Sequence, residues 1–268
     1  MQEGIWTSVG GQKDRISGFK STAFKSKMYR FNFGYDANFG DWLIGGNFKY
    51  LKSSQKSKDT FFSAKGNAHA EGLNAYAVWS NEKGCYVDLI ASLDRYHQRL
   101  STNMLDGTRV SGTYRNWGIG ASAEVGKKFF ISDERTWFVE PQFQLAYYFV
   151  SGDKFTLSNG MTGKQGNFNS LTGRAGVAAG RDIKSKDGQD KGQIYIRAGL
   201  KHEFLGHQKV DVNNERVSDK LAGTRVYYGA AAGWLIKKNL KFYGYVEREE
   251  GANYTKEVEV RAGLKWLF

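Results

Sequence analysis

The sequence predicts an all-β fold, a transmembrane antiparallel up-and-down β-barrel of 12 strands around a narrow polar lumen. Three observations predict it. Apolar and polar side chains alternate with a period of two along most of the chain, which is the pattern of strands with two unlike faces. The connections between alternating segments are mostly short at one end and long at the other. The final segment alternates strictly up to a terminal Phe268.

Composition excludes a helical membrane protein but allows a barrel. The chain has 268 residues, of which 40% are hydrophobic, and its mean hydropathy is −0.55. No run approaches the roughly 20 apolar residues that a spanning helix needs. Barrel strands face lipid on one side only and therefore average out as polar. Aromatic residues make up 15% of the chain, and in a barrel they form girdles at the two membrane interfaces.

The charge pattern and the single cysteine limit which partners, disulfides and metal sites the protein can have. The formal net charge is +12, but lysines and arginines alternate singly with apolar residues instead of clustering, which argues against a nucleic-acid partner. The lone Cys85 excludes an internal disulfide and argues against a metal cluster. Phosphate-binding glycine loops and metal-ligand spacings are missing from the sequence, so we expect no cofactor and no metal.

Twelve alternating segments are predicted as strands. Each meets or nearly meets the roughly 9–11 residues that a tilted spanning strand requires. The predicted segments are 4–12, 27–38, 42–53, 67–80, 85–100, 113–127, 136–151, 167–183, 192–205, 223–237, 240–249 and 256–268.

The connections fall into two classes. Tight ones include 39–41, 81–84 and 238–239. Long polar ones are 12–26, 54–66, 101–112, 152–166 and 206–222. Short turns at the periplasmic rim and long extracellular loops are typical of outer-membrane barrels, and an even strand count puts both termini at the short-turn rim. Pro141 falls inside a segment and predicts a local bulge, with its ring facing lipid.

If the apolar face meets lipid, the opposite face lines the lumen. Charges of both signs occur on that face, either as solvated wall charges or as contacts for a threaded polypeptide, and the two are compatible. Twelve strands lie between eight, which leave a filled interior, and 16–18, which leave an open channel. Such a lumen accepts one helix or one extended chain. The predicted pore-lining residues are Arg30, Lys49, Asp88, Glu124, Glu140, Gln142, Gln144, Arg174, Arg197 and Glu247.

Several motifs carry a resemblance to a known family. In the last strand Arg261, Gly263, Trp266 and Phe268 follow the pattern polar-x-Gly-x-x-aromatic-x-Phe, which resembles the signal read by the barrel-assembly machinery of the outer membrane. More discriminating segments accompany it in order along the chain. Together they resemble the translocator (β) domain of autotransporters, of the classical monomeric type. These segments are Gly4–Trp6, Ala123–Gly126, Val139–Gln142, Asn169–Gly176 and Gly244–Arg248.

The resemblance implies a function and a set of partners. It implies that residues 1–268 are one barrel domain of a Gram-negative outer membrane, with the passenger and most of the linker helix outside this chain. Such a barrel anchors an N-terminal passenger and helps export it to the cell surface, without being an enzyme. The implied partners are its own passenger and linker helix, the assembly machinery, periplasmic chaperones, membrane lipid and lipopolysaccharide, with the barrel as a monomer.

Two alternative functions stay open. One is a passive outer-membrane channel specific for a small acid or sugar. The other, weaker one is a hydrolase at the barrel rim, which would need an activated histidine. We interpret all four histidines as solvated or interfacial. His97 and His202 share the lipid-facing parity of their strands near the rim, whereas His69, at a strand start, and His207, in a loop, have no Ser or Asp partner in an obvious register.

The resemblance also raises self-cleavage of the passenger inside the barrel. Asp88, Glu124 and Arg248 match by position the residues of self-cleaving relatives, whereas Gln144 stands where those relatives carry a further acid. The linker-helix asparagine that would be cut is not in this chain. We therefore favour structural wall carboxylates over a catalytic group at these positions.

The tryptophans and three loop lysines are further candidates for contacts with the membrane. The seven tryptophans fall mainly near predicted strand ends and are interpreted as interfacial anchors. Lys52, Lys56 and Lys58 are candidates to meet lipopolysaccharide phosphates, although a generic solvated loop is the favoured interpretation.

Overall fold

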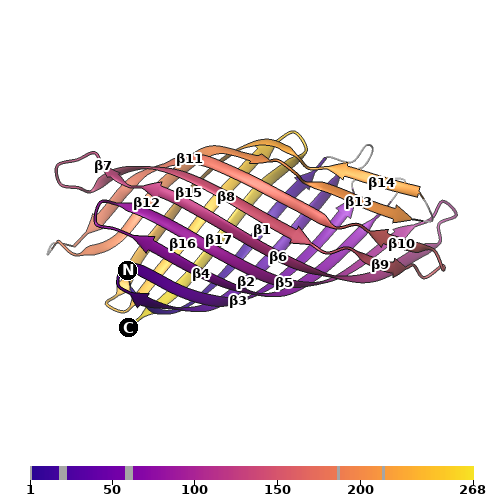
Figure 1. The fold of residues 1–268 in the computed structure, drawn as a ribbon, viewed down its shortest axis with the longest axis horizontal. Helices are drawn as coiled ribbons and strands as arrows, with labels where there is room; N and C mark the ends of the chain where they lie inside the picture. Colours follow the sequence, from indigo (N-terminus) through magenta and orange to yellow (C-terminus); the bar gives the residue numbers. More distant parts are fainter. Residues whose placement is uncertain (1, 18–22, 58–62, 186–187, 213–214) are drawn as a thin grey trace.

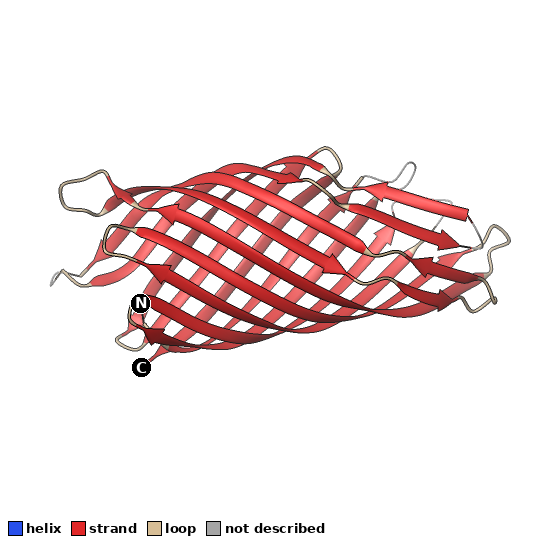
Figure 2. Ribbon diagram, in the orientation of Figure 1, coloured by secondary structure: helices blue, strands red, loops and turns tan. Residues whose placement is uncertain are grey.

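The structure, a computed structural model, describes residues 2–17, 23–57, 63–185, 188–212 and 215–268. The described strands form one sheet, which closes into a barrel because the last strand pairs antiparallel with the first (Figures 1 and 2). Twelve long strands build the barrel, and the predicted architecture is confirmed. They are β1 (Gly4–Ile16), β2 (Phe24–Phe39), β3 (Trp42–Ser57), β4 (Lys65–Ser80), β5 (Cys85–Asn103), β6 (Arg109–Lys127), β8 (Trp137–Val150), β11 (Phe168–Lys184), β12 (Asp190–Glu203), β15 (Gly223–Lys237), β16 (Leu240–Gly251) and β17 (Tyr254–Leu267).

Five short strands lie where the sequence predicted loops or turns. They are β7 (Phe129–Phe130), β9 (Asp153–Thr156), β10 (Thr162–Gln165), β13 (His207–Val212) and β14 (Glu215–Lys220). The β9–β10 and β13–β14 hairpins also pair with each other through β10 and β13. The prediction of long polar loops over 152–166 and 206–222 is therefore wrong. Beyond the membrane both faces of a strand meet water, so the apolar alternation fades while the hydrogen-bonded ladder continues.

A small apolar cluster supports this extension of the barrel wall. Val110 of β6 packs with Phe155 and Leu157 of the β9–β10 segment, and all three are less than 9% exposed. Leu100, Tyr114, Met161 and Val210 pack against them. The cluster explains why these hairpins are ordered strands although their sequences are polar.

The two ends of the barrel differ as predicted. Gly40 and Gly84 have φ of 67° and 79° in the tight turns after β2 and β4, a backbone region that side chains other than glycine rarely adopt. Both termini lie at this end, and the paired hairpins lie at the opposite end (Figure 1). We refer to the two ends as the short-turn rim and the hairpin rim.

A belt of apolar side chains covers the outer surface. On β2, for example, Tyr29, Phe31, Phe33 and Tyr35 are between 42% and 63% exposed, while Asn32 between them is 6% exposed. Large apolar side chains standing outward in this way mark a lipid-facing surface. No helix in the described part of the chain has the length and apolar character to cross a bilayer.

One tryptophan, Trp6, departs from the prediction of interfacial anchors. Trp42, Trp117, Trp137, Trp234 and Trp266 are each between 38% and 50% exposed on the outer surface. Trp6 instead donates its indole N–H to the Tyr76 hydroxyl at 2.8 Å and is partly buried, so its interpretation as an interfacial anchor is wrong.

The predicted bulge at Pro141 is also wrong. The register of β8 against β11 runs without a shift through Val177↔Pro141. On the other side, the β6–β8 ladder ends at Gly126↔Gln142 and β7 resumes it at Phe129↔Val139. The proline thus sits at an interruption of the ladder, where its missing N–H leaves no acceptor orphaned. Its ring is exposed, as expected.

Candidate functional site

The lumen wall is built from the inward positions of the long strands. The structure places all ten predicted pore-lining residues on this inner face, between outward side chains of the same strands. Cross-strand pairing brings many of them together, as in Asp88↔Glu124, Glu124↔Gln144 and Gln144↔Arg174. The alternation therefore creates a charged ring inside an apolar exterior.

One part of the wall holds an extended ionic network. Its carboxylates are Glu247, Glu249 and Glu259, which are 3%, 1% and 7% exposed. Within the described residues these three carboxylates are shared by six cations at 2.7–3.6 Å, namely Arg30, Arg174, Arg197, Lys201, Lys256 and Arg261. An excess of cations keeps each carboxylate paired, which is the condition for burying charge at acceptable cost.

Lys256 is the centre of this network. Its ammonium lies 3.2, 2.9 and 2.8 Å from Glu247, Glu249 and Glu259. Sequence reasoning missed it, because strict alternation in the last strand puts Glu257 inward. The β1–β17 register shifts between Lys13 and Asp14, whose partners are Val258 and Lys256. This β-bulge turns Lys256 inward, and Glu257 instead pairs with the outer Arg15 at 2.6 Å.

Tyrosine rings line the lumen beside the network and hold its cations. The Arg174 guanidinium lies 3.7 Å from the centroid of the Tyr227 ring, a cation–π geometry. The Tyr245 hydroxyl donates to Glu259 at 2.7 Å, and Arg197 lies over the Tyr245 ring at 5.2 Å. These contacts immobilise long side chains that would otherwise move freely in water.

Another part of the wall is acidic. Asp88 and Glu124 are cross-strand neighbours on the inner face. Tyr86 donates to Glu124 at 2.8 Å and Gln142 donates to Glu140 at 2.7 Å. Among the described residues, none of the three carboxylates forms an ion pair, and one oxygen of Asp88 is buried without a hydrogen-bond partner. The acidic wall therefore carries three neighbouring carboxylates that no cation of the described residues pairs with.

A cavity of about 340 Å³ opens beside the acidic wall. Glu124, Glu140, Arg197, Tyr195 and Lys128 are among the residues that line it. The cavity is larger than the volume of several water molecules, and side chains of both positive and negative charge line it. Such a surface suits the polar atoms of a polypeptide better than an apolar ligand.

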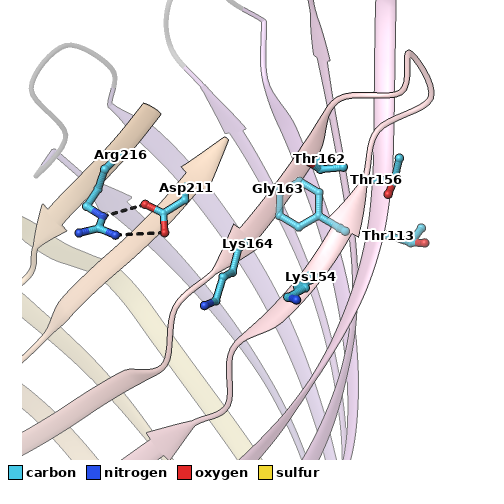
Figure 3. A pocket seen from close by; sticks show the side chains of 9 residues that line it. Thr113, Lys154, Thr156, Thr162, Gly163, Lys164, Asp211 and Arg216 are labelled. Atoms are coloured by element: carbon cyan, nitrogen blue, oxygen red, sulfur yellow. Dashed lines mark hydrogen bonds and ion pairs between the residues drawn. The ribbon is translucent and has the colours of Figure 1, made fainter. Parts of the chain in front are cut away.

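A second hollow, of about 1100 Å³, lies at the hairpin rim. Lys154, Lys164, Thr113 and the Asp211–Arg216 pair line it (Figure 3). Arg216 donates to Asp211 at 2.7 Å, and this contact lowers the pKa of the Asp211 carboxyl. The hollow has polar walls and lies far from the acidic wall.

Comparisons with known proteins agree with this architecture. The family profile described as "Autotransporter beta-domain" matches residues 5–247. The chain belongs to the autotransporter β-domain family. It is 28% identical to the pertactin autotransporter of Bordetella bronchiseptica over 98% of this chain and 28% of that protein, and 28% identical to the BrkA autotransporter of Bordetella pertussis over 99% and 26%. The chain thus spans less than a third of the length of these relatives.

Solved structures support the same fold. The β-domain of the Bordetella autotransporter BrkA superposes with a TM-score of 0.80 at 24% identity, over 100% of both chains. The translocator domain of NalP from Neisseria meningitidis gives 0.79 at 16% identity, over 99% of this chain and 89% of that one. Family and architecture together identify this autotransporter β-domain as a translocator barrel of a Gram-negative outer membrane.

The predicted assembly-signal residues of β17 and the following Phe268 divide between the two faces of the barrel wall. Trp266 and Phe268 stand outward at 49% and 67% exposure, whereas Arg261 points inward, 3.6 Å from Glu259. A side chain at Gly263 would place its Cβ 2.4 Å from the Tyr243 ring and 2.6 Å from the Thr7 carbonyl oxygen. The glycine is thus needed for the close approach of Tyr243 to the wall.

The three residues matched to self-cleaving relatives are not all brought together. Asp88 and Glu124 adjoin on the inner face. Arg248 lies on the opposite face of β16, 45% exposed at its side chain, and binds Glu250 at 2.6 Å. It therefore does not belong to the acidic wall of this autotransporter β-domain. No group of three His, Cys, Asp or Glu in the described ranges is arranged to hold a metal ion.

Proposed function

We propose that this β-domain anchors an N-terminal passenger in the outer membrane, helps export it to the cell surface and holds a segment of it in the lumen. The observation that carries the proposal is the position of Gly4. Its strand begins at the short-turn rim, where both termini lie (Figure 1). A segment joined before Gly4 starts on the periplasmic side, so it reaches the hairpin rim by crossing the lumen.

The chemistry of the lumen supports a polypeptide as its occupant. The ionic network and the acidic wall offer both signs of charge to side chains and to backbone amides. A helix with its side chains is about 10–12 Å across, which a 12-stranded lumen accommodates once.

Surface display tests the proposed export. The barrel is expressed in a Gram-negative host with its native upstream segment and an epitope before that segment. We expect the epitope to be accessible to antibody on intact cells. An epitope that becomes accessible only after the outer membrane is permeabilised, with the barrel folded, would contradict export.

A passive channel for small solutes is the alternative function. A 9% identical outer-membrane channel from Pseudomonas putida shares the fold with a TM-score of 0.60, which is a likeness of fold alone. Conductance in planar bilayers separates the two functions. A translocator with its upstream segment conducts poorly and opens when the segment is removed, whereas a channel conducts equally with the segment present.

Two finer points belong to the same proposal. We propose that Asp88 and Glu124 are structural wall residues and that the domain is not an enzyme, because Arg248 is remote from the pair and Gln144 replaces the further acid. Release of the passenger by the wild-type protein, lost in Asp88→Asn, would overturn this. We also propose that the assembly machinery reads the outward Trp266 and Phe268, and that the barrel is a monomer delivered by periplasmic chaperones.

A further inference from the structure

The outer surface of β3–β6 carries a row of basic side chains at adjacent cross-strand positions. The register pairs Lys52 with His69, His69 with His97, and His97 with Arg115. All four belong to the outward set of their strands, and Lys52, His69 and Arg115 are exposed. The two imidazole rings stack with centroids 4.7 Å apart and planes 6° apart. We call these four residues the basic row.

Further cations surround the basic row on the same outer face. Arg99 stands two residues nearer the hairpin rim on β5, and Arg95 two residues nearer the belt, over the Trp117 ring at 5.4 Å. Lys25, Lys56 and Lys65 form another cross-strand row of exposed lysines closer to the hairpin rim. Two carboxylates of the described residues adjoin the basic row: Glu71 is the cross-strand neighbour of Arg95, and Asp153 accepts a hydrogen bond from the Arg115 backbone amide at 2.8 Å.

Placing like charges directly opposite each other destabilises a sheet. Some cations on the outer surface have a carboxylate partner within the chain, since Arg15 pairs with Glu257 and Arg248 with Glu250, each at 2.6 Å. In contrast, Lys52, Arg99 and Arg115 form no ion pair with any residue that the structure describes. The positive charge of these three side chains is therefore available to bind an anion from outside the chain.

The position of the row identifies the source of that anion. Four residues nearer the short-turn rim on β4, β5 and β6, the outward side chains are Leu73, Leu93 and Ile119, which are 60%, 45% and 56% exposed. These are lipid-facing residues of the apolar belt, and Trp117 beside them is an interfacial anchor. The basic row thus begins where acyl chains end and headgroup phosphates of the outer leaflet lie.

We infer that the basic row, with Arg95 and Arg99, binds the phosphorylated headgroup of an outer-leaflet glycolipid, the lipid A part of lipopolysaccharide. Arginine and lysine supply charge-assisted hydrogen bonds to phosphate oxygens. The stacked imidazoles add ring N–H groups between the two fixed charges. The acyl chains of the same molecule pack on the belt below. Of the lysines that the sequence suggested for this role, Lys52 lies in the row and Lys56 in the neighbouring one, whereas Lys58 lies outside the described residues.

The test uses purified barrel in an uncharged detergent. Bisphosphorylated lipid A and the same lipid after removal of its phosphates are titrated separately, and bound lipid is measured by native mass spectrometry. The variant combines Lys52→Ala, Arg99→Ala and Arg115→Ala. A matched control removes three exposed cations at the short-turn rim with Lys127→Ala, Arg181→Ala and Lys237→Ala. Heat-modifiable migration on gels checks that each variant is folded.

We expect the wild type to bind bisphosphorylated lipid A and to discriminate against the dephosphorylated lipid. The row variant should lose roughly 100-fold in affinity, from the usual contribution of each Lys or Arg near an anionic lipid surface, while the control variant binds like the wild type. Equal binding of both lipids, or an unchanged affinity in a folded row variant, would overturn the inference. Inorganic phosphate that binds as tightly as lipid A would reassign the row to a free anion and also overturn it.

Discussion

At the scale of single residues, the lumen of this autotransporter β-domain depends on Lys256. The ammonium contacts three nearly buried carboxylates, all within 3.2 Å. Removing one partner of a buried ionic group leaves uncompensated charge, which costs far more than a surface pair contributes. The sequence did not reveal this residue because the bulge that turns it inward depends on pairing with β1, and alternation alone carries no information on register shifts.

We predict that Lys256→Met lowers the free energy of unfolding by roughly 3–5 kcal/mol. The measurement is urea-induced unfolding of the purified barrel in detergent, followed by tryptophan fluorescence. Arg15→Met serves as the matched control, since the Arg15–Glu257 pair is exposed and contributes roughly 1 kcal/mol or less. Equal losses for the two variants would show that the network does not stabilise the fold.

For other residues, the sequence predicted in part which face of the barrel wall the side chain takes. The period of two assigned inward and outward faces for Arg30, Asp88 and Arg174, because each lies within a regular stretch of strand. Arg248 stands one residue from Glu247 and so faces the opposite way. The resemblance to self-cleaving relatives grouped Arg248 with Asp88 and Glu124, although alternation places Arg248 on the outer face. The structure follows the alternation.

At the scale of strands, glycines decide how the tyrosines fill the lumen. Tyr227 of β15 faces Gly199 of β12, which in turn faces Gly176 of β11. The tyrosine ring reaches across both positions, and a Cβ at Gly176 would collide with its hydroxyl and lie 2.7 Å from the Ala198 carbonyl oxygen. Two neighbouring glycines thus form a groove for one ring, on which Arg174 then stacks.

We predict that Gly176→Ala displaces Tyr227 and lowers the free energy of unfolding by roughly 1–3 kcal/mol, the usual cost of overpacking. Gly11→Ala is the control, because a Cβ there meets only the Tyr29 ring at 3.9 Å. Urea unfolding of both variants measures the difference. A Gly176→Ala protein as stable as the control would refute the groove.

The hairpins at the hairpin rim are strands whose existence alternation could not predict. The β13–β14 hairpin closes on itself, with the Leu221 amide donating to the Gly206 carbonyl oxygen at 2.8 Å. It pairs with β10 and touches β11, but it is not part of the ring of long strands. Its order comes from neighbours that are distant in sequence.

We predict that replacing residues 207–220 by a two-residue turn leaves the membrane barrel intact. The ends of the deleted segment already adjoin, so closing them introduces little strain. Heat-modifiable migration should keep the wild-type fraction of folded protein. Loss of the folded band would mean that the hairpins take part in barrel assembly.

At the scale of the whole molecule, the sequence predicted the barrel and its inward residues, but not the contacts that those residues make. Strand number, the even count and the unequal rims follow from local patterns such as the alternation ending at Phe268 and the tight turn at Gly40. The ionic network and the basic row depend on which strands adjoin and in which register. The network depends on closure of the sheet, since Arg30 of β2 meets Glu259 of β17, whereas the basic row depends on the register between consecutive strands; alternation alone reports neither.

The central claim for the whole molecule is that a segment upstream of Gly4 occupies the lumen. Gln144 lies on the inner wall beside Glu124, and Thr113 is exposed on the outer face. In a Cys85→Ser background, the reaction of Gln144→Cys with a water-soluble thiol reagent measures how accessible the lumen is. The reaction of Thr113→Cys measures the accessibility of the outer surface.

The decisive measurement compares labelling rates of these two cysteines in barrels with and without the native upstream segment. We predict that the segment slows labelling at Gln144→Cys by roughly tenfold or more, as expected when ordered chain excludes reagent from all but locally opened states, and leaves Thr113→Cys unchanged. Equal labelling of Gln144→Cys in both proteins would show an unoccupied lumen and contradict the account.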